Sequence, residues 1–266
     1  MRWAPVADLL RSYGLTAEPY VGRALYNLEP AMHEDVYGGW FHTADAHLRP
    51  DRLMSALKAL LAVKGVEIIE NCQLQGLSSA RQGGMAAATS CGTLTARDIV
   101  IAAGAYSGKL LKPLGINLPI QPGKGYSITM NRPQICPTIP TIFMEESVVV
   151  TPWTSGYRLG GTMEFSGFNT EVISERIRNL RRVAHQYLKT PEGDTLVEEW
   201  VGLRPMVYDD LPIIDRTPGH SNLFIASGHG MIGLSTATAT GKLLAELVAG
   251  QTPFIDPTPF GIGRFF

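Results

Sequence analysis

The sequence predicts a mixed α/β (α+β) fold, and three observations support this prediction. Residues 222–250 read as an apolar strand, a glycine-rich turn and a helix in direct succession. Residues 51–63 carry apolar side chains at helical spacing, and the apolar run at 66–70 after them predicts a strand. From residue 118 onward, apolar and polar residues alternate between turns, which is typical of an antiparallel sheet.

Ahead of residue 118, short elements follow one another closely. Residues 4–36 favour helical and irregular structure because prolines interrupt them, and residues 37–42 favour a strand. Short strands are then expected at residues 73–77, 84–89, 92–95 and 98–103, with helix-like residues from 104 to 111. This part of the chain reads as a domain of mixed helices and strands.

Three segments make up the predicted domain organisation. Residues 1–117 form part of a first domain with a helical N-terminal segment. Residues 118–198 form an antiparallel domain closed by a helix at 171–188, and residues 199–266 return to the first domain. With 266 residues, the chain is long enough to bury a sizeable core.

Composition argues against several classes of partner. Apolar residues make up 45% and charged residues 18%, which is typical of a globular protein. The net charge is −1, and the basic run at 176–182 has the spacing of a solvated helix face, so nucleic acid is not expected as a partner. No apolar stretch approaches the roughly 20 residues that a membrane span needs. Without a signal-peptide core at the N-terminus, we expect a cytoplasmic protein.

Cysteine and histidine spacing gives no sign of a metal site. Cys72, Cys91 and Cys136 show neither C-x-x-C nor metal-ligand spacing, which predicts a reducing compartment. The six histidines and the acidic residues show no such spacing either, so no metal is expected.

The glycine turn at 228–233 (GHGMIG) formally matches G-x-G-x-x-G, but the match alone is weak. A dinucleotide fingerprint needs an acidic residue on a second strand about 20 positions later, and here the helix occupies that distance. The turn is therefore either a tight connection that favours close packing or an anion site at a helix N-terminus. Ser235 and Thr236 are the candidate helix caps.

Four segments together carry a family resemblance. They resemble the FAD-dependent D-amino-acid dehydrogenases, which belong with glycine oxidase and sarcosine oxidase to the amino-acid-oxidase superfamily. The likeness runs, with gaps, from about residue 38 to residue 264. The segments occur in the family's order and read IVIAAGAYSGKL, RLGGTMEFSGFNT, GLRPMVYDDLPIIDR and NLFIASGHGMIGLSTATATGKLLAELVAG.

The resemblance implies an FAD-binding domain of the two-dinucleotide type and an antiparallel substrate-binding domain at 118–198. In this family a βαβ unit with G-x-G-x-x-G opens the chain, whereas the first hundred residues here contain no such glycine pattern. We therefore expect an N-terminally truncated chain that corresponds to the C-terminal two thirds of such an enzyme. One alternative is a subunit of a split enzyme, whose partner chain supplies the missing dinucleotide-binding unit. The other is a non-catalytic fragment.

The resemblance also implies cofactor contacts. The cofactor would be FAD, bound non-covalently because no cysteine follows Cys136 near the C-terminal motif. Backbone groups at the turn of 228–234 would stabilise negative charge on the flavin's pyrimidine edge. The cofactor-binding residues so implied are Leu74, Ala103, Gly104, Gly202, Gly228, His229, Gly230, Met231, Ile232, Gly233 and Leu234.

Two residues are predicted to act on the substrate. Arg204, in the family's G-L/F-R-P context, would hold the substrate carboxylate through two parallel hydrogen bonds. Its alternative is a structural ion pair with Glu198 or Glu199. Tyr126 would cover the substrate cavity, or would simply pack in the sheet.

Four other residues have weaker claims. His229 is interpreted as a turn residue rather than a catalytic base. Met231 stands where some glycine oxidases carry a second arginine, which argues against a strict glycine oxidase. Glu164 and His47 are weaker candidates for the site.

The function that the resemblance implies is oxidation of the CH–NH group of a small D-amino acid. The imino acid formed would hydrolyse to a 2-oxo acid and ammonia. Electrons would pass from the flavin to a quinone or to oxygen, and family members of the dehydrogenase type can sit peripherally on the inner face of the membrane.

Overall fold

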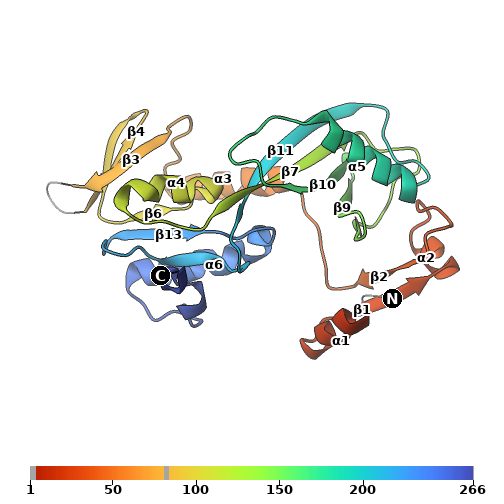
Figure 1. Ribbon diagram of the computed structural model, residues 1–266, viewed down its shortest axis with the longest axis horizontal. Helices are drawn as coiled ribbons and strands as arrows, with labels where there is room; N and C mark the ends of the chain where they lie inside the picture. Colours follow the sequence, from red (N-terminus) through yellow and green to blue (C-terminus); the bar gives the residue numbers. More distant parts are fainter. Residues whose placement is uncertain (1–3, 81–83, 266) are drawn as a thin grey trace. The chain divides into compact units, whose positions relative to one another are not determined.

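The computed structural model describes residues 4–80 and 84–265, which form two compact units (Figure 1). Unit 1 holds the chain up to Glu67 together with Tyr126–Thr162 and Glu171–Val201. Unit 2 holds Ile68–Gly125, Met163–Thr170 and the chain from Gly202 onward. Strands β7 (Gln121–Met130), β10 (Gly156–Glu164) and β11 (Leu196–Met206) each contribute residues to both units.

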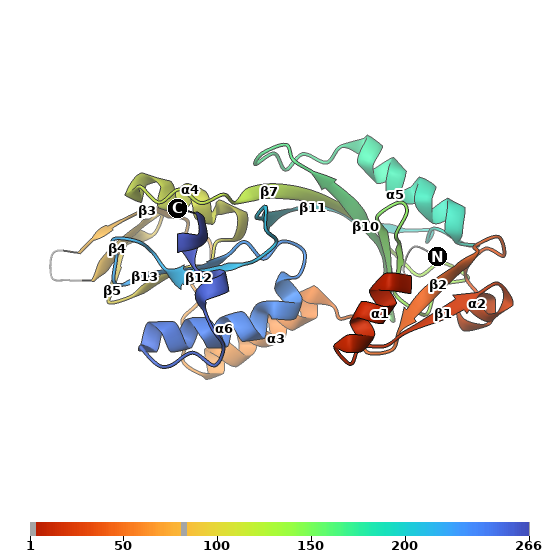
Figure 2. The same cartoon turned by 60° about the horizontal axis from the view of Figure 1, so that its bottom comes forward.

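Unit 1 contains a hairpin and most of a larger antiparallel sheet. In the hairpin, β1 (Ala17–Val21) pairs with β2 (Gly38–His42), as Figure 2 shows. In the larger sheet, β8 (Thr141–Phe143) pairs with β9 (Val148–Trp153), which pairs with β10. The strand order is β11-β7-β10-β9-β8. The alternation of residues from 118 onward therefore predicted the antiparallel sheet correctly.

Helix α5 (Ser174–Tyr187) packs on one face of this sheet. Its buried residues Ile177, Leu180 and Val183 join strand residues such as Val150 and Leu159 in one apolar core. Each fully buried aliphatic side chain of this kind contributes about 1.5–3 kcal/mol to folding. The arginines between them face away from the core, which confirms that the basic run at 176–182 belongs to an amphipathic helix.

The N-terminal part of unit 1 has more regular structure than the sequence predicted. It contains α1 (Ala4–Ser12), β1, α2 (Arg23–Leu28), β2 and α3 (Pro50–Val63). Helix α3 confirms the predicted helix at 51–63, with Pro50 in its first turn. Strand β1 was missed because Pro19 suggested irregular structure. Pro19 is tolerated because β1 is paired on one side only, with β2.

The strand expected at 66–70 is wrong. These residues form no strand, and the side chains of Val66, Ile68 and Ile69 are exposed. A strand persists only when its backbone groups have a hydrogen-bonded neighbour. No strand within the described ranges pairs with this segment.

Unit 2 contains two three-stranded sheets. In one, β6 (Ile99–Ile101) runs parallel to β13 (Leu223–Ser227), and β12 (Ile213–Arg216) pairs antiparallel with β13. The other is a ribbon of β3 (Leu74–Ser79), β4 (Met85–Thr89) and β5 (Gly92–Ala96). Strands β3, β4, β5 and β6 begin and end within two residues of their expected positions. Each of them has a neighbouring strand to pair with.

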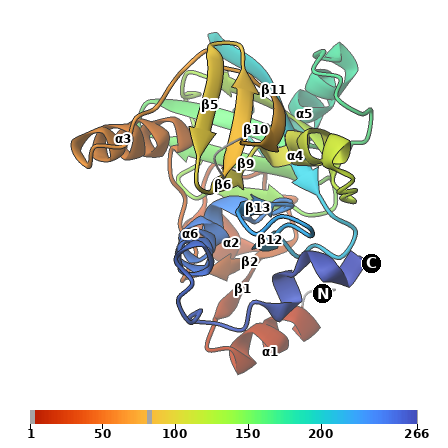
Figure 3. The same cartoon turned by 90° about the vertical axis from the view of Figure 1, so that its left-hand side faces the viewer.

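Short helices and α6 complete unit 2. After β6 come the 3₁₀ turn η1 (Gly104–Tyr106), α4 (Ser107–Leu111) and η2 (Lys112–Leu114), where helix-like residues were expected. Helix α6 (Gly233–Ala249) packs beside β12 and β13 (Figure 3) and ends at Gly250, whose φ of 66° suits glycine. The chain then forms η3 (Thr258–Phe260) and η4 (Ile262–Phe265).

The predicted caps of α6 are wrong. The helix begins at Gly233, so Ser235 and Thr236 lie inside its first turn, and Thr236 Oγ1 donates back to Ile232 O at 3.1 Å. No side chain among the described residues caps this helix.

No helix within residues 4–80 or 84–265 is long and apolar enough to cross a membrane.

Candidate functional site

The candidate site lies where the parallel strands β6 and β13 end. Both strands lead into glycine turns at their carboxyl ends, at Gly104 and Gly228. The buried Ser227 hydroxyl donates to Gly104 O at 2.8 Å and so ties the two turns together. In open α/β sheets, ligands bind outside the carboxyl ends of parallel strands. The turn positions Ala103, Gly104 and Gly228 therefore share one edge of unit 2.

Gly228 and Gly230 form the turn between β13 and α6 in backbone conformations that favour glycine. Their φ angles are 80° and 54°. A Cβ atom on Gly228 would lie 2.7 Å from Val207 Cγ2, so the strand end packs closely on the core. Gly230 N–H donates to Pro205 O at 3.0 Å, which joins the turn to the segment that follows Arg204.

Replacing Gly228 with alanine is expected to destabilise the protein by about 2–4 kcal/mol, since a positive φ and an overpacked methyl group act together. Urea unfolding with an unchanged m-value would measure the loss. Gly241→Ala is the matched control. Gly241 lies inside α6 with no atom within 4 Å of an added Cβ, so this change should stabilise the protein by about 0.5–1 kcal/mol. Equal effects of the two changes would contradict the packing argument.

The N-terminus of α6 is open to an anionic group. This helix of 17 residues has no side-chain cap and no acidic residue in its first turn. The first backbone N–H groups of any helix lack intrahelical acceptors and carry the positive end of the helix dipole. Met231, Ile232 and Leu234 around this terminus are exposed. The arrangement can hold a group that bears or acquires negative charge.

Arg204 lies half-buried on β11, packed over a glycine. A methyl group on Gly125 would overlap its guanidinium, and its Nη1 lies 3.9 Å from Met163 Sδ. Burial lowers the pKa of Arg204, although an arginine stays protonated at neutral pH. A planar cation over a bare backbone, beside a methionine, can orient a carboxylate.

The structural alternative for Arg204 was an ion pair with Glu198 or Glu199, and the structure pairs Glu198 with a different arginine. Arg158 Nη2 donates to Glu198 Oε2 at 2.8 Å, and Arg158 Nε donates to Thr129 Oγ1 at 2.7 Å. Both residues belong to unit 1, whereas Arg204 belongs to unit 2. Arg158 therefore has the structural role that this alternative gave to Arg204.

A buried ion pair was missed by the sequence reasoning. Lys124 Nζ on β7 lies 3.1 Å from Glu164 Oε1 on β10, and the side chains are 0% and 12% exposed. Glu164 was a weak candidate, and Lys124 was not considered. In the sequence, Lys124 stands between two glycines. In the structure, the strand that contains it is buried along most of its length. A lysine is rarely buried so fully without a partner.

The structure places the remaining predicted site residues in different surroundings, some in a core and some on a strand or turn. Tyr126 is 2% exposed in the apolar core of unit 1, and Leu74 packs on the core of unit 2. Gly202 lies on β11 two residues before Arg204. His229 Nε2 is 3.0 Å from Thr240 Oγ1 on α6, and burial lowers the pKa of His229, which favours the neutral ring. The interpretation of His229 as a turn residue stays a prediction.

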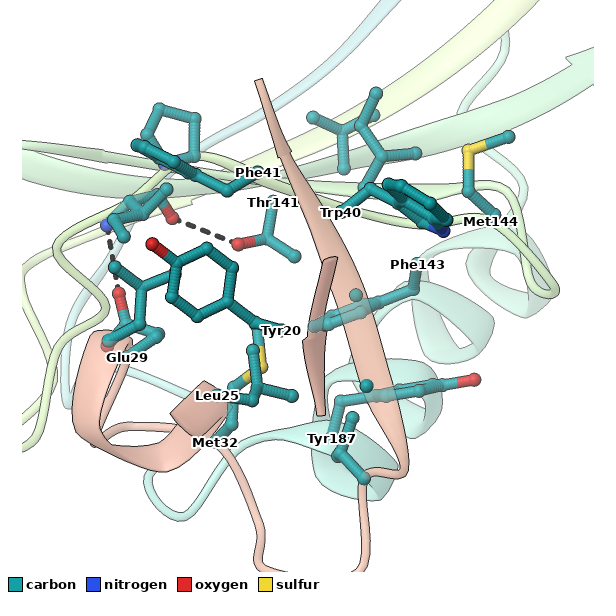
Figure 4. A pocket seen from close by; sticks show the side chains of 18 of the residues that line it. Tyr20, Leu25, Glu29, Met32, Trp40, Phe41, Thr141, Phe143, Met144 and Tyr187 are labelled. Atoms are coloured by element: carbon teal, nitrogen blue, oxygen red, sulfur yellow. Dashed lines mark hydrogen bonds between the residues drawn. The ribbon is translucent and has the colours of Figure 1, made fainter. Parts of the chain in front are cut away.

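A large cavity of about 1520 Å³ lies within unit 1, and of the predicted site residues only the weaker candidate His47 is part of its described lining. Figure 4 shows Tyr20 and Phe41 on one side of the hairpin and Trp40 on the side of Phe143 and Tyr187, whose rings stack at 4.1 Å. Five carboxylates belong to its described lining, which contains no lysine or arginine. Such walls suit an apolar or aromatic group that carries positive charge. The carboxylates are Glu29, Asp35, Asp45, Glu145 and Glu146.

Comparison with known proteins identifies the family. Residues 2–247 match the family described as FAD dependent oxidoreductase. The chain belongs to this family. This finding confirms the family resemblance of the four sequence segments.

Individual relatives agree with this assignment. The chain is 33% identical over 239 residues to a glycine oxidase of Pseudomonas putida, covering 89% of this chain and 65% of that protein. It is 31% identical over 266 residues to a D-amino acid dehydrogenase of Paramagnetospirillum magneticum, covering 97% and 62%. The crystal structure of glycine oxidase from Geobacillus kaustophilus matches with a TM-score of 0.90 and 25% identity, covering 97% and 70%. The mixed α/β fold with antiparallel sheets is thus confirmed, and the chain spans less than two thirds of the curated relatives' length.

FAD is the cofactor of this family, and residues of unit 2 fit part of it. The N-terminus of α6, which no side chain among the described residues caps, provides backbone donors, and a Cβ atom on Gly104 would meet no atom within 4 Å. In addition, the fully buried Ser107 Oγ, three residues after Gly104, has no hydrogen-bond partner among the described residues. A buried hydroxyl without a partner is costly unless a ligand or water satisfies it.

Proposed function

We propose that the chain carries the substrate-oxidising site of an FAD-dependent enzyme that acts on the CH–NH group of a small amino acid. The observation that carries this proposal is the joining of Arg204 to the glycine turn, through the hydrogen bond from Gly230 N–H to Pro205 O. The site therefore combines a carboxylate-binding cation with an anion-stabilising helix terminus. Relatives named glycine oxidase and D-amino acid dehydrogenase support the same class of substrate.

Each group would have a defined task. When bound, FAD supplies the acceptor for the hydride from the substrate Cα. Arg204 would hold the substrate carboxylate in one orientation with two parallel hydrogen bonds. The α6 terminus would stabilise negative charge on the flavin's pyrimidine edge. His229 would remain neutral and position the turn through Thr240. FAD would be held without a covalent bond, and a quinone or oxygen would take the electrons.

The substrate proposed is a small D-amino acid, oxidised to an imino acid that hydrolyses to a 2-oxo acid and ammonia. Met231 stands exposed at the turn where a second arginine would grip the substrate in some glycine oxidases. Methionine in place of that second arginine argues against a substrate restricted to glycine.

Absorbance between 350 and 500 nm tests this proposal on the purified chain with added FAD. We expect flavin bands that shift on binding and bleach on anaerobic addition of D-alanine. Bands that are present but do not bleach with any of several small D- or L-amino acids would refute the proposed substrate class. If the chain binds no flavin, it cannot oxidise a substrate by itself, and this result would favour the second candidate described below.

The second candidate is one subunit of a split flavoenzyme, in which a partner chain supplies a further dinucleotide-binding unit. The observation that favours it is the exposure of apolar side chains on α3, where no residue is buried. Met54, Leu57 and Leu60 are 63%, 41% and 50% exposed. An apolar helix face of this kind is usually covered by another polypeptide segment. Co-expression with a candidate partner should then restore flavin binding and shift the complex to a larger size on gel filtration.

A further inference from the structure

Two cysteines far apart in sequence lie together beside the β3–β4 ribbon of unit 2. Strand β3 pairs with β4 so that Leu74 lies opposite Thr89. One step further, Ser90 N–H donates to Gln73 O at 2.9 Å, and Gln73 N–H donates to Ser90 Oγ at 2.9 Å. Cys72 precedes Gln73, and Cys91 follows Ser90 in the two-residue turn that joins β4 to β5, where Thr89 pairs with Gly92.

Side-chain contacts agree with this arrangement. Cys72 Sγ lies 3.2 Å from Thr89 Oγ1, and Cys91 N–H donates to the same oxygen at 3.1 Å. Cys91 Sγ lies 3.8 Å from Asn71 O, the carbonyl that precedes Cys72. The two thiols therefore share one small polar site.

The shared partner suits a covalent link. The Cys72 sulfur and the Cys91 backbone N–H both hydrogen-bond Thr89 Oγ1, so the two residues lie within a few ångströms of one common oxygen. Disulfides join residues whose Cα atoms are usually about 4.4–6.8 Å apart, so only neighbouring residues such as these can be linked without backbone movement.

We propose that Cys72 and Cys91 are a peroxide-oxidisable thiol pair that closes to an intramolecular disulfide. This modification site does not depend on the proposed flavin reaction. Cys91 is exposed, so an oxidant in solution can reach the pair, and Cys72 is half-buried beside it.

The chemistry balances in two steps. The Cys72 thiolate attacks one oxygen of hydrogen peroxide, breaks the O–O bond and forms a sulfenic acid, and the other oxygen leaves as water after protonation. The Cys91 sulfur then attacks the Cys72 sulfur, forms the S–S bond and releases a second water. Two thiols are oxidised, and one peroxide is reduced to two waters.

The order of the two cysteines follows from their hydrogen bonds. The hydrogen bond from the Cys91 thiol lowers the pKa of Cys72, and the same interaction raises the pKa of Cys91. Because the thiolate is the nucleophile, Cys72 reacts first and Cys91 resolves. Burial raises the pKa of Cys136, which makes this third cysteine an internal control.

The test exposes the full chain to a small molar excess of hydrogen peroxide, blocks remaining thiols with an alkylating reagent and measures mass. We expect that two cysteines are no longer alkylated and that two tryptic peptides are found linked. Trypsin places Cys72 and Cys91 in separate peptides because it cleaves after Arg81 and Arg97. Cys136 should remain alkylated. In Cys91→Ser, oxidation should stop at a Cys72 sulfenic acid that dimedone traps.

Three outcomes would overturn the proposal, and the first two concern the oxidation of a single chain. In the first, all three cysteines of the chain remain alkylatable although a small thiol added to the same sample is oxidised. The second is independent over-oxidation of Cys72 and Cys91, with no linked peptide in the wild type. Thermal unfolding of Cys91→Ser and Cys72→Ser checks that the folded state persists, since serine is nearly the size of cysteine. Linked peptides between two chains, on non-reducing gels, would also contradict an intramolecular pair.

Discussion

Replacing Arg204 with lysine is expected to slow flavin reduction by D-alanine about 10- to 150-fold at low substrate concentration. This range corresponds to the loss of one hydrogen bond to a charged group, about 1.5–3 kcal/mol. Lysine keeps the positive charge but lacks the planar fork that fits a carboxylate. Arg204→Ala should cost more, because the charge is lost as well. Stopped-flow bleaching of the flavin under anaerobic conditions measures both.

The packing of Arg204 over Gly125 makes this experiment specific. The guanidinium has little freedom above the bare backbone, so its orientation is set before substrate arrives. Arg216→Lys is the matched control, since Arg216 is an exposed arginine of the same unit that packs over Phe224. The flavin of the Arg216→Lys variant should be reduced at the wild-type rate. An Arg204→Lys enzyme with full flavin content and a wild-type rate would exclude Arg204 as the carboxylate-binding group.

Replacing Lys124 with alanine is expected to destabilise the protein by about 3–5 kcal/mol, because a buried carboxylate then loses the cation beside it. The pair is almost fully buried, with Lys124 Nζ 3.1 Å from Glu164 Oε1. Urea unfolding followed by circular dichroism measures the loss, and an unchanged m-value shows that the two states compared are the same.

A double change separates charge from packing at this pair. Lys124→Met combined with Glu164→Leu removes both charges and keeps most of the volume, so it should recover most of the lost stability. Lys242→Ala is the surface control: Lys242 Nζ lies 3.9 Å from Glu246 Oε1 with 60% of its side chain exposed, and the cost should be below about 1 kcal/mol. If the single and double changes at Lys124 cost the same, the stability effect is one of packing and not of charge.

Local patterns predicted those elements whose stability is largely local. The helix at 51–63 was read correctly from apolar spacing, and the helix that ends at Gly250 from its glycine stop. The strand at 66–70 was predicted with the same apolar signal and is absent, because a strand depends on a neighbour that its own sequence does not contain. The predicted caps of α6 are wrong because helix α6 begins directly at the glycine turn, before Ser235 and Thr236, and has no side-chain cap among the described residues.

The features of the candidate site also fall into those that the sequence predicted and those that only the structure revealed. The sequence by itself determined the family, through four segments in order, and the apolar strands, the glycine turn and an arginine in a characteristic context, because each of these is a short run of residues. Only the tertiary structure decided that Arg204 packs over Gly125, that Lys124 meets Glu164, and that Cys72 lies beside Cys91. These contacts join residues between 19 and 79 positions apart. Their geometry depends on strand register and on the burial of charge, which no local pattern of residues specifies.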